Sequence, residues 1–290
     1  MLRYALLAVA MRVAGRLPAV ALYPLASCVG LLAYALNGAS RRAVRANVAR
    51  VSGPRVPAAA RERHVRRIFR NAAWYWADMA RLPRMTPQAV RAEIAFQGED
   101  AFREVLAQGP AMLTSAHFSN AEFLLQCLPA FGRTWLGLIE RLEPPPLFRF
   151  MVQLRSHQGN RFTAADRHGA FAAVRHLRDG GLIGVLADRD VTGGGVPVTI
   201  CGAPVRLPPG PVELAMRFRA PVVLVSCGRL GPRRFYARFD VAFQPLRATD
   251  RAAAIDANLS VIAEWLEASL RRDPGQWSVL HPMWDGDPTG

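Results

Sequence analysis

The chain has 290 residues, of which 51% are hydrophobic and 20% are charged. This composition excludes a disordered protein and suits one large domain, or a core domain with a smaller appendage. The formal net charge is +15, and every basic residue other than histidine is arginine, because the sequence contains no lysine. A charge of this size indicates an anionic partner, either nucleic acid or an acidic membrane surface.

The cysteines and histidines give no sign of a metal site. None of Cys28, Cys127, Cys201 and Cys227 stands at C-x-x-C spacing, and no H-E-x-x-H motif occurs. Two of the cysteines lie in apolar runs. We therefore expect free thiols in a reducing compartment, without structural zinc or disulfides, and no metal at the functional site.

The amino-terminal region combines an apolar segment with arginines. Residues 17–40 carry no charge and are long enough to cross a bilayer, although Pro18, Pro24 and Gly30 interrupt them. Arg12 and Arg16 break any signal-peptide core. The arginines that follow this segment are Arg41, Arg42, Arg45, Arg50, Arg61, Arg63, Arg66, Arg67 and Arg70.

An apolar helix beside a basic cluster is the arrangement that holds a protein on an anionic membrane, and the cluster predicts the cytoplasmic side. The alternative is a buried helix with a solvated basic face. Residues 1–92 are thus predicted to form a helical, membrane-associated region, which either spans the bilayer or lies on it.

From about residue 94 the pattern changes to strands alternating with helices. Residues 111–115, 182–187 and 221–227 read as buried strands, and residues 235–241 as a solvent-facing one. Further elements are expected as helices at 122–130, 169–178, 211–219 and 252–271, and as a hairpin around 201–204. Residues 93–290 are therefore predicted to form an α/β domain whose mixed, mostly parallel sheet is flanked by helices.

Polar clusters follow two of the predicted strands. Residues 117–122 come after the strand at 111–115, and residues 188–190 come after the strand at 182–187. Ligands of open α/β sheets bind beyond the carboxyl ends of the strands. These clusters therefore mark the predicted site.

His117 and Glu122 are the candidate catalytic pair. On one continuous helix they would not meet, but a strand–turn–helix geometry would let Glu122 orient the imidazole as a general base. The alternative is structural, because Ser119 and Glu122 also fit an S-x-x-E capping box. The sequence contains no G-x-S-x-G motif that would mark a nucleophilic serine.

Residues 116–122 (AHFSNAE) resemble the H-x4-[D/E] motif of glycerolipid acyltransferases, and most closely the lipid A lauroyl/myristoyl acyltransferase family. That family includes bacterial phosphatidylinositol mannoside acyltransferases. The resemblance continues through residues 146–148 (PLF), Arg155, and the blocks 184–190 (GVLADRD), 195–198 (GVPV), 202–204 (GAP), 209–211 (PGP), 276–277 (QW) and 282–284 (PMW), so it covers nearly the whole chain. Residues 187–190 and 276–277 are closer to the mannoside-acylating branch.

The resemblance implies an O-acyltransferase in which His117 is the base and Glu122 its partner. The expected substrate-binding residues are Arg155, Asp188, Arg189, Asp190, Ser119 and Asn120. At position 119 the family usually has glycine, and at position 121 often tryptophan, so the acyl pocket is expected to differ here.

No resident cofactor is implied, because an acyl-CoA or acyl carrier protein serves as co-substrate. The other expected partners are a lipid acceptor and an anionic membrane surface, at the cytoplasmic face of the inner membrane. The acceptor is either a lipid A precursor or a phosphatidylinositol mannoside-like glycolipid.

Two other functions fit parts of the sequence. A lipid or thioester hydrolase would use the same histidine and glutamate with water as the acceptor. A basic membrane- or nucleic-acid-binding protein would account for the net charge. Nucleic acid is disfavoured, because the arginines cluster beside an apolar segment and no nucleic-acid-binding motif occurs.

Overall fold

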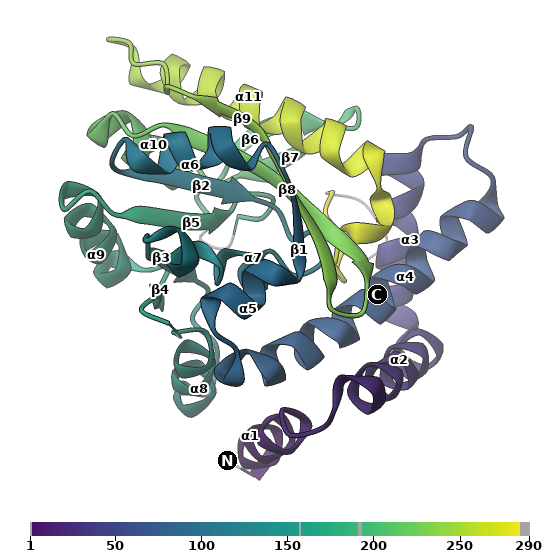
Figure 1. Ribbon diagram of the computed structural model, residues 1–290. Coiled ribbons are helices and arrows are strands. Elements are labelled where there is room, and N and C mark those ends of the chain that lie inside the picture. Colours follow the sequence, from purple (N-terminus) through teal and green to yellow (C-terminus); the bar gives the residue numbers. More distant parts are fainter. Residues whose placement is uncertain (1, 157, 191–192, 285–290) are drawn as a thin grey trace.

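The computed structural model describes residues 2–156, 158–190 and 193–284. A seven-stranded sheet with helices on both faces forms its main body, and a layer of amino-terminal helices packs along one side (Figure 1). This architecture confirms the predicted fold class.

The amino-terminal layer is entirely helical. Its elements are α1 (Leu2–Ala14), α2 (Ala19–Leu36), α3 (Gly38–Ser52), α4 (Ala58–Arg81), the 3-10 turn η1 (Leu82–Arg84) and α5 (Pro87–Ala92). Local signals set several boundaries. The Asn37 side chain caps the start of α3, and Thr86 caps α5 directly before a proline. The first strand follows at Ile94.

Helix α2 lies along α4. Tyr23 packs edge-on against Trp74, with 5.7 Å between ring centroids. At Gly30 the two helices approach so closely that a Cβ atom would stand 2.9 Å from the carbonyl oxygen of Phe69, so only glycine fits there. The opposite side of α2 is exposed. Its exposed apolar residues are Val20, Leu25, Val29, Leu31, Leu32 and Leu36.

The strands of the main sheet are β1 (Ile94–Gln97), β2 (Ala111–Ser115), β3 (Trp135–Ile139), β4 (Arg161–Ala164), β5 (Leu182–Leu186), β8 (Val222–Gly231) and β9 (Arg234–Phe243). Their order is β1-β9-β8-β2-β5-β3-β4. Every neighbouring pair is parallel except β8 and β9, which are joined as an antiparallel hairpin. A separate hairpin joins β6 (Val196–Ile200) to β7 (Ala203–Leu207), around the turn predicted from the sequence.

Helices cover both faces of this sheet. The covering elements are α6 (Glu99–Ala107), α8 (Pro145–Arg155), α9 (Arg167–Arg178), α10 (Gly210–Phe218) and α11 (Arg251–Arg272). Successive residues of the central strands enter different core clusters: Met112 belongs to one and Leu113 to the other. Because both faces are covered, β2 is buried along its whole length and reads as a continuous apolar run.

One predicted helix is divided in two. Instead of a single helix over 122–130, the chain forms α7 (Ala121–Leu125) and the 3-10 turn η2 (Leu128–Phe131). Pro129 has no backbone N–H to donate to Leu125, so an α-helix cannot continue through it. The capping box is also wrong, because Asn120 and not Ser119 caps α7, accepting from the backbone N–H of Phe123.

Candidate active site

His117 and Asp188 lie at the same edge of the sheet. The last residues of β2 and β5, Ser115 and Leu186, are direct partners in a parallel ladder. His117 and Asp188 each follow two residues later. The register of two neighbouring strands therefore brings together residues separated by 71 positions in the sequence.

The Asp188 carboxylate holds His117 at two points. Its Oδ1 lies 2.8 Å from His117 Nδ1, and its Oδ2 accepts from the His117 backbone N–H at 3.1 Å. Trp277 Nε1 also donates to Oδ2, at 2.8 Å. Because an ionised carboxylate only accepts, Nδ1 carries the proton and the lone pair is left on Nε2. The sequence assigned this orienting contact to Glu122, but Asp188 makes it.

Asp188 is fully buried, whereas about a third of the His117 side chain (32%) is open to the cavity described below. Burial lowers the pKa of His117, but the charge of Asp188 and its hydrogen bond raise it by more, so the pKa lies above its ordinary 6.5. The pKa of Asp188 is lowered: burial raises it, but the charge of His117 and hydrogen bonds from His117 and Trp277 outweigh that effect. The pair therefore favours an ionised carboxylate beside a basic imidazole.

The loop that carries His117 is fixed from its carboxyl-terminal side by a distant segment. The backbone N–H of Ser119 donates to the carbonyl of Gln276 at 2.6 Å, and that of Ser278 donates to the carbonyl of His117 at 2.8 Å. Ser119 has φ +50°, a left-handed conformation that glycine adopts without strain. The glycine usual at this position in the resembling family thus has a backbone reason.

Glu122 belongs to a second group in the same cavity. Its Oε2 accepts from Arg155 Nε at 2.9 Å and from the hydroxyl of Tyr75 at 2.8 Å. Arg155 Nη2 also donates to the Tyr75 hydroxyl at 2.9 Å, which closes a triangle. The Glu122 and Arg155 side chains are only 14% and 12% exposed. This site therefore contains two separate carboxylates, one on the imidazole and one on a guanidinium.

The remaining predicted residues lie at different places around the site. Arg189 lines the cavity and approaches Glu140 at 3.9 Å. Asp190 is turned to its own loop, where it accepts from the backbone N–H groups of Gly193 and Gly195. Ser119 and Asn120 are buried, and neither of them lines the cavity.

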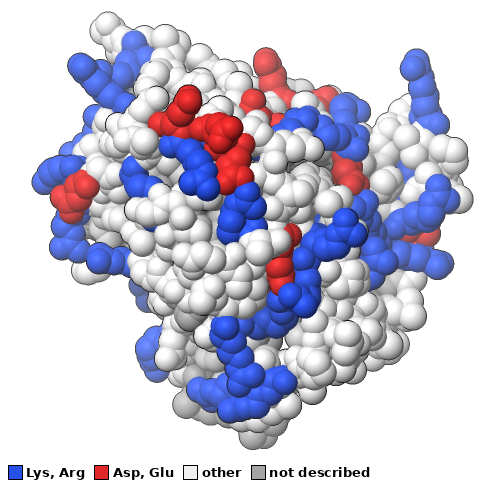
Figure 2. All heavy atoms as spheres, in the orientation of Figure 1, with Lys and Arg blue, Asp and Glu red and all other residues white. Residues whose placement is uncertain are grey.

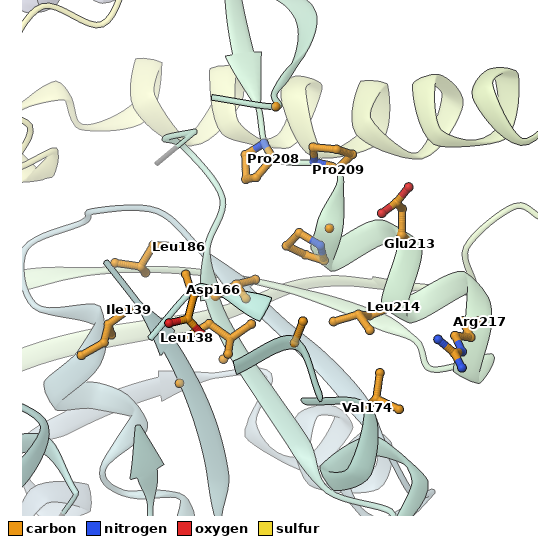
Figure 3. Close-up of a pocket in the computed structure, with 18 of the residues that line it drawn as sticks. Leu138, Ile139, Asp166, Val174, Leu186, Pro208, Pro209, Glu213, Leu214 and Arg217 are labelled. Carbon is orange, nitrogen blue, oxygen red and sulfur yellow. The ribbon is translucent and has the colours of Figure 1, made fainter. Parts of the chain in front are cut away.

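A cavity of about 2060 Å³ opens beside His117, Glu122 and Arg155. It extends between α9 and α10, where Val174 and Leu214 face one another across it (Figure 3). Its apolar lining includes Leu138, Leu142, Phe171, Val174, Leu186 and Leu214. Ordinary small-molecule sites measure about 300–1,000 Å³, so this cavity has room for more than one substrate group.

Arginines form a further part of the cavity lining. Those that line it and are exposed are Arg167, Arg175, Arg178, Arg217, Arg247 and Arg251. Arg251 is paired with Glu213, at 2.8 Å. The cavity thus combines an imidazole, apolar side chains and a rim of exposed arginines.

Two site residues were missed from the sequence. Tyr75 belongs to no motif that the sequence presents, yet its hydroxyl contacts both Glu122 and Arg155. Trp277 was noted only as part of a resembling block. Its indole N–H on a buried carboxylate could be recognised only once the carboxyl-terminal segment was positioned in space.

An oriented imidazole beside a large, partly apolar cavity, on a mostly parallel α/β sheet, suits an enzyme that acts on an acyl chain. The comparison with known proteins is more specific. The chain matches the family described as bacterial lipid A biosynthesis acyltransferase over residues 1–285, and it belongs to that family. It is accordingly an acyltransferase.

Curated relatives lie in the mannoside-acylating branch. The chain is 27% identical over 261 residues to a phosphatidylinositol mannoside acyltransferase of Mycolicibacterium smegmatis, which covers 88% of this chain and 83% of that protein. It is 26% identical over 253 residues to a phosphatidylinositol mannoside acyltransferase of Mycobacterium tuberculosis, with 84% and 77% covered. These relatives match the suspected family.

Proposed function

We propose that this protein transfers a fatty acyl chain from an acyl thioester to a hydroxyl of a phosphatidylinositol mannoside-like glycolipid. The observation that carries the proposal is the His117–Asp188 pair at the edge of a large, partly apolar cavity. In this assignment His117 is the general base and Asp188 the residue that orients it.

The chemistry needs one base and no covalent intermediate. Nε2 of His117 takes the proton from the acceptor hydroxyl as its oxygen attacks the thioester carbonyl. The new C–O bond forms, the C–S bond breaks, and the imidazolium returns its proton to the departing thiolate. Asp188 stabilises the imidazolium while this charge exists. Transfer then takes place in a ternary complex.

The cavity suits the donor. Its apolar lining between α9 and α10 would cover an alkyl chain, and its arginine rim would face the phosphates of an acyl-CoA or of an acyl carrier protein's prosthetic group. Either donor is a co-substrate. The volume left over would admit the acceptor's head group near Arg155 and Arg189.

The choice of acceptor follows the relatives. Both name phosphatidylinositol mannoside, whereas the family description names lipid A. Hydroxyl-rich head groups of either glycolipid would suit the Glu122–Arg155 group, which presents a carboxylate and a guanidinium to the same cavity. We favour the mannoside because the sequence blocks at 187–190 and 276–277 are closer to that branch.

Membrane attachment at the cytoplasmic face of the inner membrane forms part of the proposal. Helix α2 has a mean hydropathy of 1.9, and it is the one helix in the described part of the chain that is long and apolar enough to cross a bilayer. Arginines gather over α3 and α4, beside the white surface of the amino-terminal helices (Figure 2). Apolar and basic groups together bind anionic leaflets.

The test is transfer itself. Purified protein is incubated with palmitoyl-CoA, or with palmitoyl carrier protein, and with phosphatidylinositol mannoside in vesicles, and the lipids are analysed by mass spectrometry. We expect an added palmitoyl ester, lost by a factor of about 10² or more in His117→Ala. Equal transfer by that variant would overturn the catalytic assignment.

The same assay separates the alternatives. A hydrolase would release palmitate at the same rate with and without glycolipid. An acyl-enzyme mechanism would give a covalent adduct on a serine or cysteine in acid-quenched protein incubated with donor alone. A nucleic-acid-binding protein would bind duplex DNA at least as tightly as anionic vesicles.

A further inference from the structure

A buried polar cluster lies behind the loop that carries His117. It consists of Tyr23 on α2, Asp78 on α4, Asn120 at the start of α7 and Arg229 on β8, and none of them is more than 2% exposed. Asp78 is at its centre. It accepts from the hydroxyl of Tyr23 at 2.6 Å, from Asn120 Nδ2 at 3.1 Å and from the guanidinium of Arg229.

The cluster reaches the motif loop through Asn120. While its Nδ2 is held by Asp78, its Oδ1 accepts from the backbone N–H of Phe123 and so starts α7. Gln276 holds the other side of the same loop, and its side chain exchanges two hydrogen bonds with the backbone of Arg229. Both supports of the loop therefore meet at the Asp78–Arg229 ion pair.

The cluster reaches the exposed amino-terminal layer through Tyr23. This residue stands on α2, whose outer side is apolar and bare, while its hydroxyl bridges Asp78 and Arg81. A hydrogen bond to a buried carboxylate is directional and costly to leave unmade, so the position of α2 and the orientation of Asp78 depend on each other.

We infer that Asp78 is a positioning residue, which fixes the His117 loop through Asn120 and makes that position depend on the seating of α2 through Tyr23. The inference rests on the proposed function, because it assumes that His117 is the general base. It assigns to the amino-terminal layer a part in catalysis besides attachment to lipid.

Two tyrosines on α2 give a matched test. Tyr23 and Tyr34 each donate a hydrogen bond to a carboxylate on α4, Asp78 and Glu62 respectively. Each packs edge-on against an α4 aromatic ring at a centroid distance of 5.7 Å. The partner of Tyr34, Glu62, is also bound by Arg45 and lies outside the cluster. Tyr23→Phe and Tyr34→Phe therefore remove the same kind of bond, and only the first reaches the loop.

Turnover and its pH profile are measured for wild type and both variants, in vesicles, well below the melting temperature of each. We expect Tyr23→Phe to lower kcat about tenfold with little change in donor KM, because a displaced catalytic group reacts more slowly. The acid limb of its pH–rate profile, where activity rises as His117 loses its proton, should also move to lower pH. The reason is that a loosened loop weakens the contact between His117 and Asp188. Tyr34→Phe should do neither.

The pH at the midpoint of this acid limb is the decisive measurement. A smaller folded fraction lowers the apparent kcat but leaves this midpoint unchanged. The groups that act on His117 are Asp188, Glu122 and Arg189, with His281 nearby, and neither substitution alters them. Midpoints that coincide in wild type and both variants would overturn the inference.

The companion variant Asp78→Asn removes the carboxylate partner of a buried arginine and is expected to unfold at a lower temperature. If it folds, it should show a larger shift of the midpoint than Tyr23→Phe, and a wild-type profile would count against the inference.

His117→Ala separates the two proposals. If wild type makes no ester, the proposed function fails. If wild type is active, His117→Ala is inactive and both tyrosine variants behave alike, only the inference fails.

Discussion

At the scale of single residues, this site divides two tasks between two carboxylates. Asp188 is wholly buried and binds the imidazole and the backbone of His117, whereas Glu122 binds Arg155 and Tyr75. A carboxylate on Nδ1 fixes the tautomer that acts as a base, while one paired with a guanidinium has its charge already neutralised. Asp188 is therefore the residue expected to control turnover.

Substituting each carboxylate by its amide tests this division. Asp188→Asn should lower kcat by about 10²–10⁴-fold, because an amide neither fixes the tautomer nor stabilises imidazolium. Glu122→Gln should act mainly through the glycolipid KM and through thermal stability, since it leaves Arg155 beside a neutral partner. Steady-state kinetics in both substrates, with melting curves, would check this. A greater loss of turnover in Glu122→Gln would return the orienting role to Glu122.

The pH dependence has a definite sign. The base must be neutral, so kcat/KM should rise with pH through the pKa of His117, which Asp188 holds above 6.5. Asp188→Asn should move this acid limb to lower pH. The same raised pKa adds stability below the pKa of the unfolded chain, and that stability is lost as pH rises through the folded value. An acid limb at or below pH 6.5 in wild type would contradict this picture.

At the scale of elements, α2 has two unlike sides. One packs on α4 through Tyr23, Leu22 and Gly30, and the other exposes leucines and valines. Only 22% of the helix is buried, which a core helix of a soluble protein would not show. Its exposed side is therefore the surface that should meet lipid.

Polar substitutions on that side should weaken vesicle binding without unfolding the protein. Leu32 and Leu36 are 57% and 75% exposed, and burying a leucine contributes about 1.5–3 kcal/mol. The double variant Leu32→Gln/Leu36→Gln should lower the vesicle-bound fraction in sedimentation at least about tenfold. The control is Leu246→Gln, since Leu246 is 53% exposed on the segment before α11. Equal loss in the control would sink the assignment of this surface.

At the scale of the whole molecule, the cavity is formed by segments distant in sequence. Strands β3 and β5 form one wall, and α9 and α10 close over it, with Val174 and Leu214 on opposite sides (Figure 3). If this space holds the acyl chain, its length sets the longest chain accepted.

Filling the cavity should change chain-length preference. Val174→Trp should lower kcat/KM for a sixteen-carbon donor more than for a twelve-carbon donor, with little effect on the melting temperature because the added ring enters open space. Competition between the two thioesters, read by mass spectrometry, measures the ratio. His168→Trp is the control, because His168 is exposed on the same helix and does not line the cavity. An unchanged ratio in Val174→Trp would mean that the chain lies elsewhere.

Local patterns in the sequence determined the fold class and marked the right edge of the sheet. The run at 111–115 forms β2 within the predicted bounds, and polar residues after β2 and β5 do converge. Periodicity and strand-end position suffice for this, because they depend on neighbours in the chain and on the parallel arrangement of the strands. The apolar stretch at 17–40 likewise contains the one long apolar helix of the described residues.

Tertiary structure alone decided which side chains meet. Spacing five residues apart suggested that Glu122 would orient His117, but the register of β2 against β5 supplies Asp188 instead. Tyr75 reaches the site from α4 and Trp277 from the carboxyl-terminal segment, and Asn120 replaces Ser119 as the helix cap. Hydrogen-bond partners are set by distances in space, which strand pairing and helix packing determine after the local elements have formed.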